Sequence, residues 1–388
     1  MAEADSKLNK KLQYGMVGGG QGAFIGEVHR KSIALDGLAE IAAGCFSRSP
    51  DNTAATGRAL GVSPDRCYKT FEEMAEAESK RPDRIDFAVI VSSNNVHYAA
   101  AKAFLTRGIH VVCDKPLCRD VAEARELVAL AVKNKLLFGM TYTYSGYPAV
   151  KQIREMIRQG EIGDLRFVNA EYPQEWLAAR LGKGDEKKLK WRLDPEIGGI
   201  ANCVADVGTH IECTVAYMTG LKIKSLCARL DKIVEGRVLD DNASIMVEYT
   251  NGAKGLYWSS QIAIGFGNAL KIRIFGSKGT IEWSHESPNN FNVYRLGKPG
   301  EHWSRGREAF SPHAQSYSRI PSGHPEGFFE AMGNIYKTYI SALSKLKAGQ
   351  PLGEADLDFS NGEMGLDGVR FINKCVESSE KGAVWVDL

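Results

Sequence analysis

The first third of the chain alternates short apolar runs with amphipathic stretches. Phe87–Val91 is an uninterrupted apolar run, which is typical of a strand buried on both faces of a sheet. Thr70 to Glu73 have the spacing of a capping box and predict the start of a helix. Similar patterns predict further strands at 39–46, 109–113 and 136–141, and helices at 50–60, 99–105 and 121–135. This β-α-β alternation predicts a parallel sheet with right-handed crossovers.

The pattern changes after residue 144. Ile245, Val247 and Tyr249 alternate with other residues, as in a sheet with one buried face, and Asn251–Gly252 is a hairpin signal. A strand is predicted at 165–170, and strands follow one another without helices between them at 225–230, 243–250, 255–260, 270–275 and 280–283. Helices are predicted at 148–159, 206–218, 325–346 and 361–379. Residues 171–192 show no clear apolar period, and residues 297–323 are predicted to form a loop because they show almost none. An α+β region with an open, mostly antiparallel sheet is expected.

These patterns divide the 388 residues into two predicted domains, 1–142 and 143–388, since the chain is too long for one ordinary core. The net charge of +2 gives no reason to expect nucleic acid or an anionic membrane as a partner, and no apolar run approaches a membrane span. Eight cysteines without a CxxC pair argue against zinc and against disulfides. The N-terminus is polar and lacks the apolar core of a signal peptide. Together, the cysteines and this N-terminus predict a cytoplasmic protein without a bound metal.

A glycine-rich segment carries the first chemical signal. Gly18-Gly19-Gly20-Gln21-Gly22-Ala23 fits the pattern G-x-G-x-x-A, between the first predicted strand and the first predicted helix. Glycine lets a backbone approach a ligand closely, and the N-terminus of a helix attracts a pyrophosphate. A dinucleotide site in a Rossmann-type domain is expected, and a simple tight turn is the alternative. The expected contacts are Gly18, Gly20, Gln21, Ala23, Phe24 and Ile25.

The residues after the second strand bear on the choice of cofactor. An acidic residue that binds the ribose hydroxyls is expected there, but the sequence has Ser47-Arg48-Ser49. A missing carboxylate and a present arginine favour the 2′-phosphate of NADP. Arg48 is equally well explained as a solvated surface charge, so NAD and NADP both stay open. Ser47 and Arg48 are candidate cofactor contacts.

Two polar segments follow the buried strands at 87–91 and 109–113. In open α/β sheets, ligands bind at the carboxyl ends of the strands. We therefore expect cofactor contacts from Ser92, Asn94, His97, Asp114 and Lys115. A lone lysine at such a place is more often a surface residue.

Asp206 and His210 lie four residues apart in a predicted helix. On an α-helix this spacing places both side chains on one face, where the carboxylate can orient the imidazole and tune its pKa. The pair alone is a weak predictor, since Asp-x3-His is common by chance.

Together these segments are far more specific. The glycine turn, Ser92-x-Asn94-x2-His97, Asp114-Lys115-Pro116 and Asp206-x-Gly-x-His210 appear in an order that resembles the Gfo/Idh/MocA family of oxidoreductases, over nearly the whole chain. The resemblance implies a Rossmann domain followed by an open-faced α/β domain. It also implies oxidation of the hydroxyls of sugars, inositols or related polyols with NAD or NADP. Lys115, Asp206 and His210 correspond to the family's catalytic positions.

Three departures from the family pattern are visible. Three extra residues separate Gly18 from the Gly26-x-x-His29 end of the motif. Asp114 replaces a glutamate, and Cys213 stands where an acid is often found. None of these changes removes Lys115, Asp206 or His210.

The longer glycine segment, with Thr141–Pro148 and Gly323–Gly327, resembles a subgroup that includes levoglucosan dehydrogenase. This implies a pyranose-type substrate, possible oxidation at its C3, and a lean toward NAD. It also implies that Tyr142 and His324 contact substrate, with a core aromatic and a residue at a helix N-terminus as the alternatives. Trp191 and Arg192, ahead of the Asp/His segment, are candidates for binding sugar hydroxyls or are surface residues.

The expected reaction is oxidation of a secondary alcohol by hydride transfer. His210 is the predicted base, Asp206 orients it, and Lys115 stabilises the developing alkoxide, with Lys115 as base the alternative. A ligand-sensing protein of the same fold, or a sugar–sugar oxidoreductase that never releases its cofactor, would be the competing functions. An apolar outer face of the second sheet is expected to form a homodimer or homotetramer.

Overall fold

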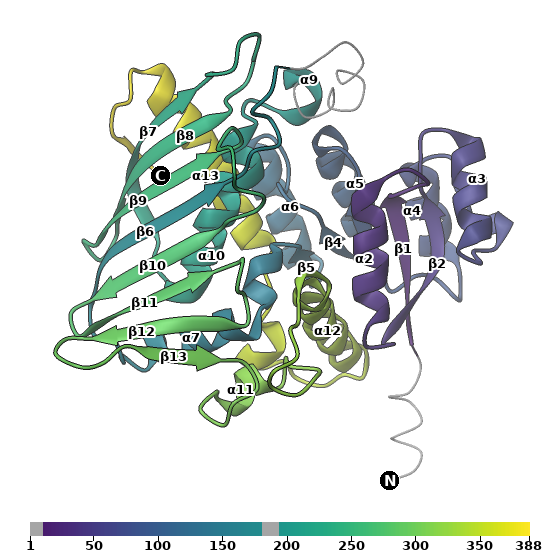
Figure 1. The fold of residues 1–388 in the computed structure, drawn as a ribbon. Coiled ribbons are helices and arrows are strands. Elements are labelled where there is room, and N and C mark those ends of the chain that lie inside the picture. The colour runs from purple at the N-terminus through teal and green to yellow at the C-terminus, as the bar shows by residue number, and fades with distance from the viewer. Residues whose placement is uncertain (1–10, 181–193) are drawn as a thin grey trace. The chain divides into compact units, whose positions relative to one another are not determined.

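The computed structural model describes residues 11–180 and 194–388 (Figure 1). Contacts divide the chain into two compact units. One comprises the chain up to Thr141 together with Phe328–Leu366, and the other comprises Tyr142–Gly327 and Asp367–Leu388. Trp191 and Arg192 lie outside the described residues.

A five-stranded parallel sheet forms the centre of the first unit. Its strands are β1 (Leu12–Gly18), β2 (Ala39–Cys45), β3 (Phe87–Val91), β4 (His110–Cys113) and β5 (Phe138–Met140), in the order β2-β1-β3-β4-β5. The connecting helices are α2 (Phe24–Ala34), α3 (Pro50–Ala59), α4 (Phe71–Lys80), α5 (Asn94–Thr106) and α6 (Val121–Lys133). The predicted parallel Rossmann sheet is confirmed.

The helix predicted at 99–105 begins earlier than expected. Helix α5 starts at Asn94 rather than at residue 99, so Asn94 and His97 lie in its first turns and not in a loop. Polar residues in a first helical turn carry no apolar period, which is why the pattern missed them.

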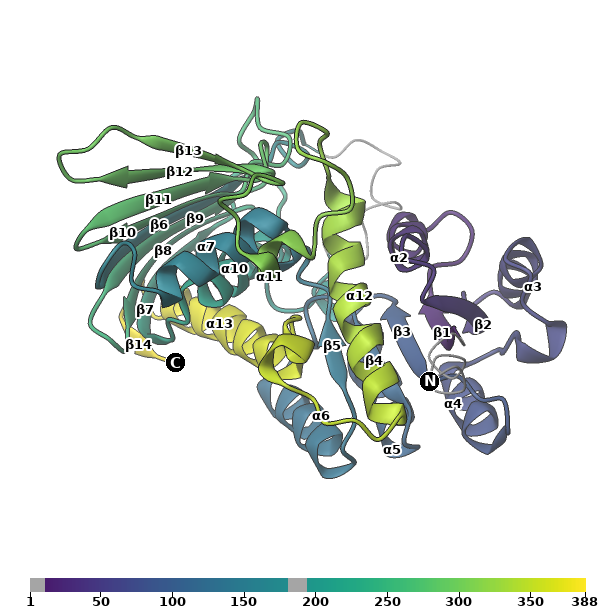
Figure 2. The same cartoon turned by 90° about the horizontal axis from the view of Figure 1, so that it is seen from below.

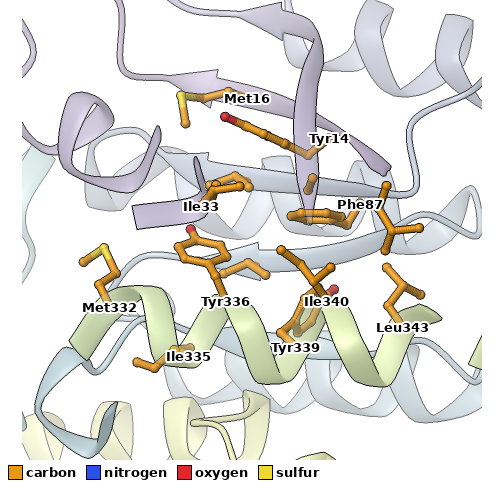
Figure 3. Close-up of a cluster of buried hydrophobic side chains, with 14 of the residues drawn as sticks. Tyr14, Met16, Ile33, Phe87, Met332, Ile335, Tyr336, Tyr339, Ile340 and Leu343 are labelled. Carbon is orange, nitrogen blue, oxygen red and sulfur yellow. The ribbon is translucent and has the colours of Figure 1, made fainter. Parts of the chain in front are cut away.

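One late helix packs in the first unit. Tyr336, Tyr339 and other residues of α12 (Phe328–Lys347) form a buried cluster with Tyr14 and Phe87 of the sheet (Figure 3). The Tyr339 hydroxyl donates hydrogen bonds to the carbonyls of residues Val111 and Leu137, both at 3.2 Å. The predicted boundary at 142/143 places residues 328–366 in the second domain, whereas the structure groups them with the first unit. A boundary drawn along the sequence cannot show where a later apolar helix face packs.

A nine-stranded sheet forms the second unit, in the order β13-β12-β11-β10-β6-β9-β8-β7-β14. Its strands are β6 (Leu165–Pro173), β7 (Ile223–Asp231), β8 (Asn242–Tyr249), β9 (Lys254–Ser260), β10 (Lys271–Gly276), β11 (Gly279–Ser284), β12 (Asn290–Arg295), β13 (Glu301–Ser304) and β14 (Val386–Asp387). Only the β6–β9 pair among them is parallel, so the mostly antiparallel sheet is confirmed.

Helices cover one face of this sheet. Figure 2 shows α7 (Pro148–Arg158), α10 (Thr209–Thr219) and α13 (Gly362–Glu380, of which Asp367 onward belongs to this unit) on the same side. The other face carries partly exposed apolar side chains, among them Phe167, Met246 and Leu256. Charged side chains such as Arg273 and Glu282 lie on the same face, so the apolar outer face and the homodimer or homotetramer built on it stay predictions.

The expectation that 297–323 has no regular structure was wrong. The segment contains β13 and the short helix α11 (Pro312–Gln315), and β12 directly before it was not predicted. Elements of four residues are too short to show a period. Strand β12 did carry a signal, since its buried Phe291 and Val293 alternate with less buried neighbours.

Candidate functional site

The glycine turn of the first unit is held in a conformation that side chains disfavour. Gly18, Gly19 and Gly22 have φ of +84°, +72° and +89°, in the left-handed region. A Cβ on Gly26 would lie 2.3 Å from the Cα of Gly19, so helix α2 packs directly against the turn. Residues Gln21 to Ala23 complete the turn before the helix begins.

Two side chains of α3 hold the turn from outside the motif. The Gln21 amide donates to Asn52 Oδ1 at 3.1 Å and to Thr56 Oγ1 at 3.0 Å, and Asn52 Nδ2 donates to the Gln21 carbonyl at 3.1 Å. A Cβ on Gly20 would lie 2.5 Å from Asn52 Oδ1. Sequence reasoning missed Asn52 and Thr56, because a polar residue in a helix gives no sign of what it binds.

The turn fits a bound dinucleotide. Ala23, the N-cap of α2, provides no side-chain cap to the first amides of this helix, whereas the Ser49 side chain caps α3. Phe24 is 81% exposed and Ile25 is partly buried, which leaves Phe24 able to contact a ligand. These features suit a pyrophosphate, and the predicted contacts there stay a prediction.

Ser47 and Arg48 follow β2 as expected. The Ser47 amide donates to Thr53 Oγ1 at 3.0 Å, and Arg48 is exposed. The first acidic residue after this strand is Asp51, in the first turn of α3.

His97 joins the ends of β3 and β4. Its imidazole is buried, with Nε2 3.0 Å from the carbonyl oxygen of Ser92 and Nδ1 2.8 Å from that of Pro116. The ring nitrogens therefore contact the protein backbone. These contacts indicate that His97 helps to shape the segment that carries Lys115. The predicted contact of His97 with the cofactor stays a prediction.

Asp114 and Lys115 follow β4. Asp114 Oδ1 accepts hydrogen bonds from the Lys115 amide at 2.9 Å and from Thr141 Oγ1 at 2.7 Å. The carboxylate thus fixes the backbone at the lysine and connects β4 to the end of the next strand. Lys115 is placed at the carboxyl end of a central strand, where α/β sheets bind ligands.

In the second unit, Asp206 lies in a π-helical turn, Val204–Gly208, which leads into α10. The helix predicted from residue 206 is present, but its first residues form a π turn, which bonds i to i+5 and is wider than an α turn. The buried Asp240 side chain accepts from the amides of Asn202 at 2.6 Å and Val204 at 2.8 Å, and so fixes the start of the turn. Such π turns are frequent at functional sites.

His210 is surrounded by tyrosines. The ring centroids of Tyr144, Tyr142 and Tyr172 lie 4.9, 5.8 and 6.2 Å from that of the imidazole, the first two edge-on. Asp206 Oδ2 accepts from Gln261 Nε2 at 2.9 Å, and Gln261 Oε1 accepts from Asn202 at 2.7 Å. The amides hold the carboxylate, and the aromatic rings restrict where the imidazole can point.

A polar network extends from this ring of tyrosines. Tyr144 and Tyr172 share a short hydroxyl contact, and Tyr172 donates to Asn268 Oδ1, which also accepts from Gln174 Nε2 at 2.6 Å. Burial raises the pKa of Tyr144 to about 12, so this phenol stays protonated at neutral pH. Sequence reasoning missed Asn268, Gln174 and Gln261, which lie at strand ends far apart in the sequence.

Tyr142 and His324, two further predicted substrate contacts, lie in different surroundings. Tyr142 is buried beside His210, and its hydroxyl lies 3.1 Å from Thr209 Oγ1. His324 is exposed, four residues ahead of α12 rather than at its N-terminus, and its carbonyl accepts a short hydrogen bond from Arg305. The substrate roles of both residues stay predictions.

Among the residues that the structure describes, no helix is long and apolar enough to cross a membrane. The same residues include no group of three or more His, Cys, Asp or Glu side chains arranged to hold a metal ion. All eight cysteines are free thiols.

A parallel sheet with a glycine turn after its first strand is typical of a nucleotide-binding domain. Comparison with known proteins shows to which family the chain belongs. Residues 12–142 match the oxidoreductase family with an NAD-binding Rossmann fold, and residues 150–282 match the GFO/IDH/MocA C-terminal domain. The chain therefore belongs to the Gfo/Idh/MocA family and is an oxidoreductase, as its motifs predicted.

Several relatives cover most of the chain. The uncharacterized oxidoreductase YfiI of Bacillus subtilis is 35% identical over 100% of this chain and 99% of its own. A crystal structure of an inositol dehydrogenase homolog from Azotobacter vinelandii, complexed with NADH and myo-inositol, is 35% identical, with a TM-score of 0.92 and coverage of 98% of this chain and 99% of that one. Levoglucosan dehydrogenase of Pseudarthrobacter phenanthrenivorans is 25% identical over 73% of this chain and 76% of its own.

Proposed function

We propose that this protein is an NAD-dependent dehydrogenase that oxidises a secondary hydroxyl of an inositol-like or sugar-like polyol to a ketone. The observation that carries the proposal is the environment of His210, where an imidazole lies among tyrosines and follows Asp206 by four residues, with the Asp206 carboxylate held by Gln261. Aromatic faces and amide groups are suited to a compact ligand with many hydroxyls, since they offer apolar contact together with directed hydrogen bonds. The relatives with inositol and levoglucosan in their names support the same substrate class.

Bound NAD would supply the hydride acceptor. The glycine turn from Gly18 to Ala23 would hold its pyrophosphate against the N-terminus of α2. We favour NAD over NADP because the structure named above contains NADH and because Arg48 is a plain exposed side chain.

His210 is proposed to take the proton of the substrate hydroxyl, a step for which a positioned base contributes roughly 10²–10⁴-fold. Asp206 would orient the imidazole, and Gln261 in turn holds Asp206. Lys115 is assigned the stabilisation of negative charge on the substrate oxygen, in the role its motif predicts. Asn268 and Gln174 are proposed to select among polyols, since the Asn268 amide oxygen accepts from Tyr172 and Gln174 and its nitrogen donates to the Tyr144 hydroxyl.

The test is a screen of the purified protein with NAD and with NADP against inositols, pyranoses and levoglucosan. Turnover with at least one polyol is expected, with a higher kcat/KM for NAD. Lys115→Met should abolish it, while the matched surface variant Lys278→Met should not. Binding of NADH without turnover of any polyol would instead favour a ligand-sensing protein.

A further inference from the structure

His29 is a buried histidine for which the proposed reaction has no use. It lies on α2, the helix that leaves the glycine turn, and its side chain is 0% exposed. Its Nδ1 is 2.6 Å from the hydroxyl of Tyr336, which projects from α12 toward the sheet (Figure 3). Its Nε2 has no hydrogen-bond partner within the part of the chain that the structure describes, and Asp114 Oδ1 lies 4.0 Å away.

The environment of the imidazole disfavours its charged form and selects one tautomer. Burial lowers the pKa of His29, and Arg30 lowers it further, while Asp114 acts in the opposite direction. A proton on Nδ1 would leave the Nε2 lone pair facing the Asp114 carboxylate in a buried place, which is electrostatically unfavourable. A proton on Nε2 turns this contact into an attraction, and Tyr336 then donates to Nδ1.

Asp114 connects this histidine to Lys115. The oxygen that faces His29 is the one that accepts from the Lys115 amide and from Thr141 Oγ1. A carboxylate with two donors on one oxygen, and with the His29 Nε2 4.0 Å from the same oxygen, has little freedom to turn. The position of the Lys115 backbone therefore depends on where this carboxylate is held.

We infer that His29 is a positioning residue: with Tyr336 fixing its tautomer, it directs Nε2–H at Asp114 and so connects the helix of the glycine turn to the segment that carries Lys115. The three residues Tyr336, His29 and Asp114 come from α12, α2 and the end of β4, all within the first unit. The inference rests on the proposed function only for the catalytic part that Lys115 plays.

The test compares His29→Leu, which has no donor, with His29→Gln, which keeps an N–H of similar reach. Hydrogen–deuterium exchange of the segment 113–117 is measured without ligand, together with kcat, the KM for polyol and the Kd of NADH. His29→Leu should speed exchange of the 113–117 amides by about 5- to 10-fold and lower kcat by a similar factor, with the Kd of NADH within about twofold. His29→Gln should restore most of both.

Ser32→Ala is the matched control, because Ser32 is buried one turn further along α2 and its hydroxyl also lacks a hydrogen-bond partner in the described residues. It should change neither exchange nor kcat. Unchanged exchange in His29→Leu, an equal change in Ser32→Ala, or no rescue by glutamine would overturn the inference.

Tyr336→Phe provides the measurement if His29→Leu does not fold. Without the hydroxyl the tautomer is no longer fixed, so exchange at 113–117 should rise, by less than in His29→Leu. Exchange at the wild-type rate in Tyr336→Phe would contradict the inference. A wild-type protein that oxidises no polyol would refute the proposed function, yet the exchange results would still decide the role of His29.

Discussion

The glycine turn and the surroundings of His210 are the two candidate binding regions, and they are built in opposite ways. The turn is a contiguous segment, Gly18 to Ala23, whose shape comes from backbone angles that glycine permits. The surroundings of His210 come from side chains on separate elements, such as Tyr144, Tyr172 and Asn268, joined by hydrogen bonds. The glycine turn depends on positions without a side chain, whereas the surroundings of His210 depend on the particular side chains that are present.

This difference determines which property is lost when each region is mutated. A Cβ placed on Gly18 or Gly19 meets backbone atoms first, and no rotamer change can relieve such a clash. A side chain changed near His210 leaves the backbone intact and removes one specific hydrogen bond or proton acceptor. We therefore expect changes in the turn to affect cofactor binding, and changes near His210 to affect turnover.

The largest effect is expected for His210→Asn. Loss of the proposed base should lower kcat by roughly 10²–10⁴-fold. The Kd of NADH, measured by fluorescence titration, should stay within about twofold because the glycine turn belongs to the other unit. His302→Asn, an exposed histidine on β13, is the control and should behave as wild type. A loss of NADH binding as large as the loss of kcat would break the contrast between the two regions.

Gly26→Ala should have the next largest effect. The new Cβ would lie 2.3 Å from the Cα of Gly19, so α2 must move away from the turn. Overpacking of this kind costs about 1–3 kcal/mol, and NADH should bind about 10- to 100-fold more weakly. Gly267→Ala is the control, since a Cβ there meets nothing within 4 Å and its φ is not positive. Wild-type NADH affinity in Gly26→Ala would show that the turn tolerates a side chain.

The sequence predicted the fold of both units well, for a physical reason. Buried parallel strands such as Phe87–Val91 are continuous apolar runs, and half-buried strands such as β8 alternate, so both leave a local pattern. Short elements such as β13 and α11 leave none. The packing of α12 in the first unit could not be predicted, because an apolar helix face does not indicate the sheet it covers.

The residues of the candidate site also fall into those that the sequence could predict and those that it could not. Gly18, Lys115 and His210 belong to motifs whose chemistry shows in the sequence. Asn52 and Asn268 are defined only by contacts with residues far along the chain, Gln21 in one case and Tyr172 in the other. A single polar residue in a helix or loop carries no sign of such a partner.

Asn52→Ala tests whether the turn also depends on a side chain. The variant loses both hydrogen bonds between Asn52 and Gln21, while Thr56 still accepts from the Gln21 amide. NADH affinity should fall by about 5- to 10-fold, as expected for one net hydrogen bond, with kcat at saturating NAD unchanged. Asn373→Ala, on α13, is a control for loss of an asparagine in the other unit, where its amide donates to the carbonyl of Val369. An unchanged affinity in Asn52→Ala would mean that the glycine angles alone fix the turn.

The smallest effect is expected at Glu212, two residues beyond His210 on α10. Burial raises the pKa of Glu212 to about 8, Asp367 raises it further, and Lys222 acts against both. A carboxyl whose folded-state pKa lies above its unfolded value of 4.5 binds its proton more tightly in the folded protein. The free energy of unfolding should therefore fall as pH rises from about 4.5 to 8, and level off above that.

Glu212→Gln removes this titration. Between pH 7 and pH 9 the wild type should lose about 1 kcal/mol of stability relative to the variant, which corresponds to one unit of a pKa shift, and thermal unfolding at both values measures it. The kcat at pH 7 should be unchanged, because the protonated side chain and glutamine have the same charge and nearly the same shape. A parallel fall of stability in both proteins would contradict the assignment. A fall in kcat would mean that buried polar groups on α10 beyond His210 also contribute to turnover, and that the second region is larger than the ring of tyrosines.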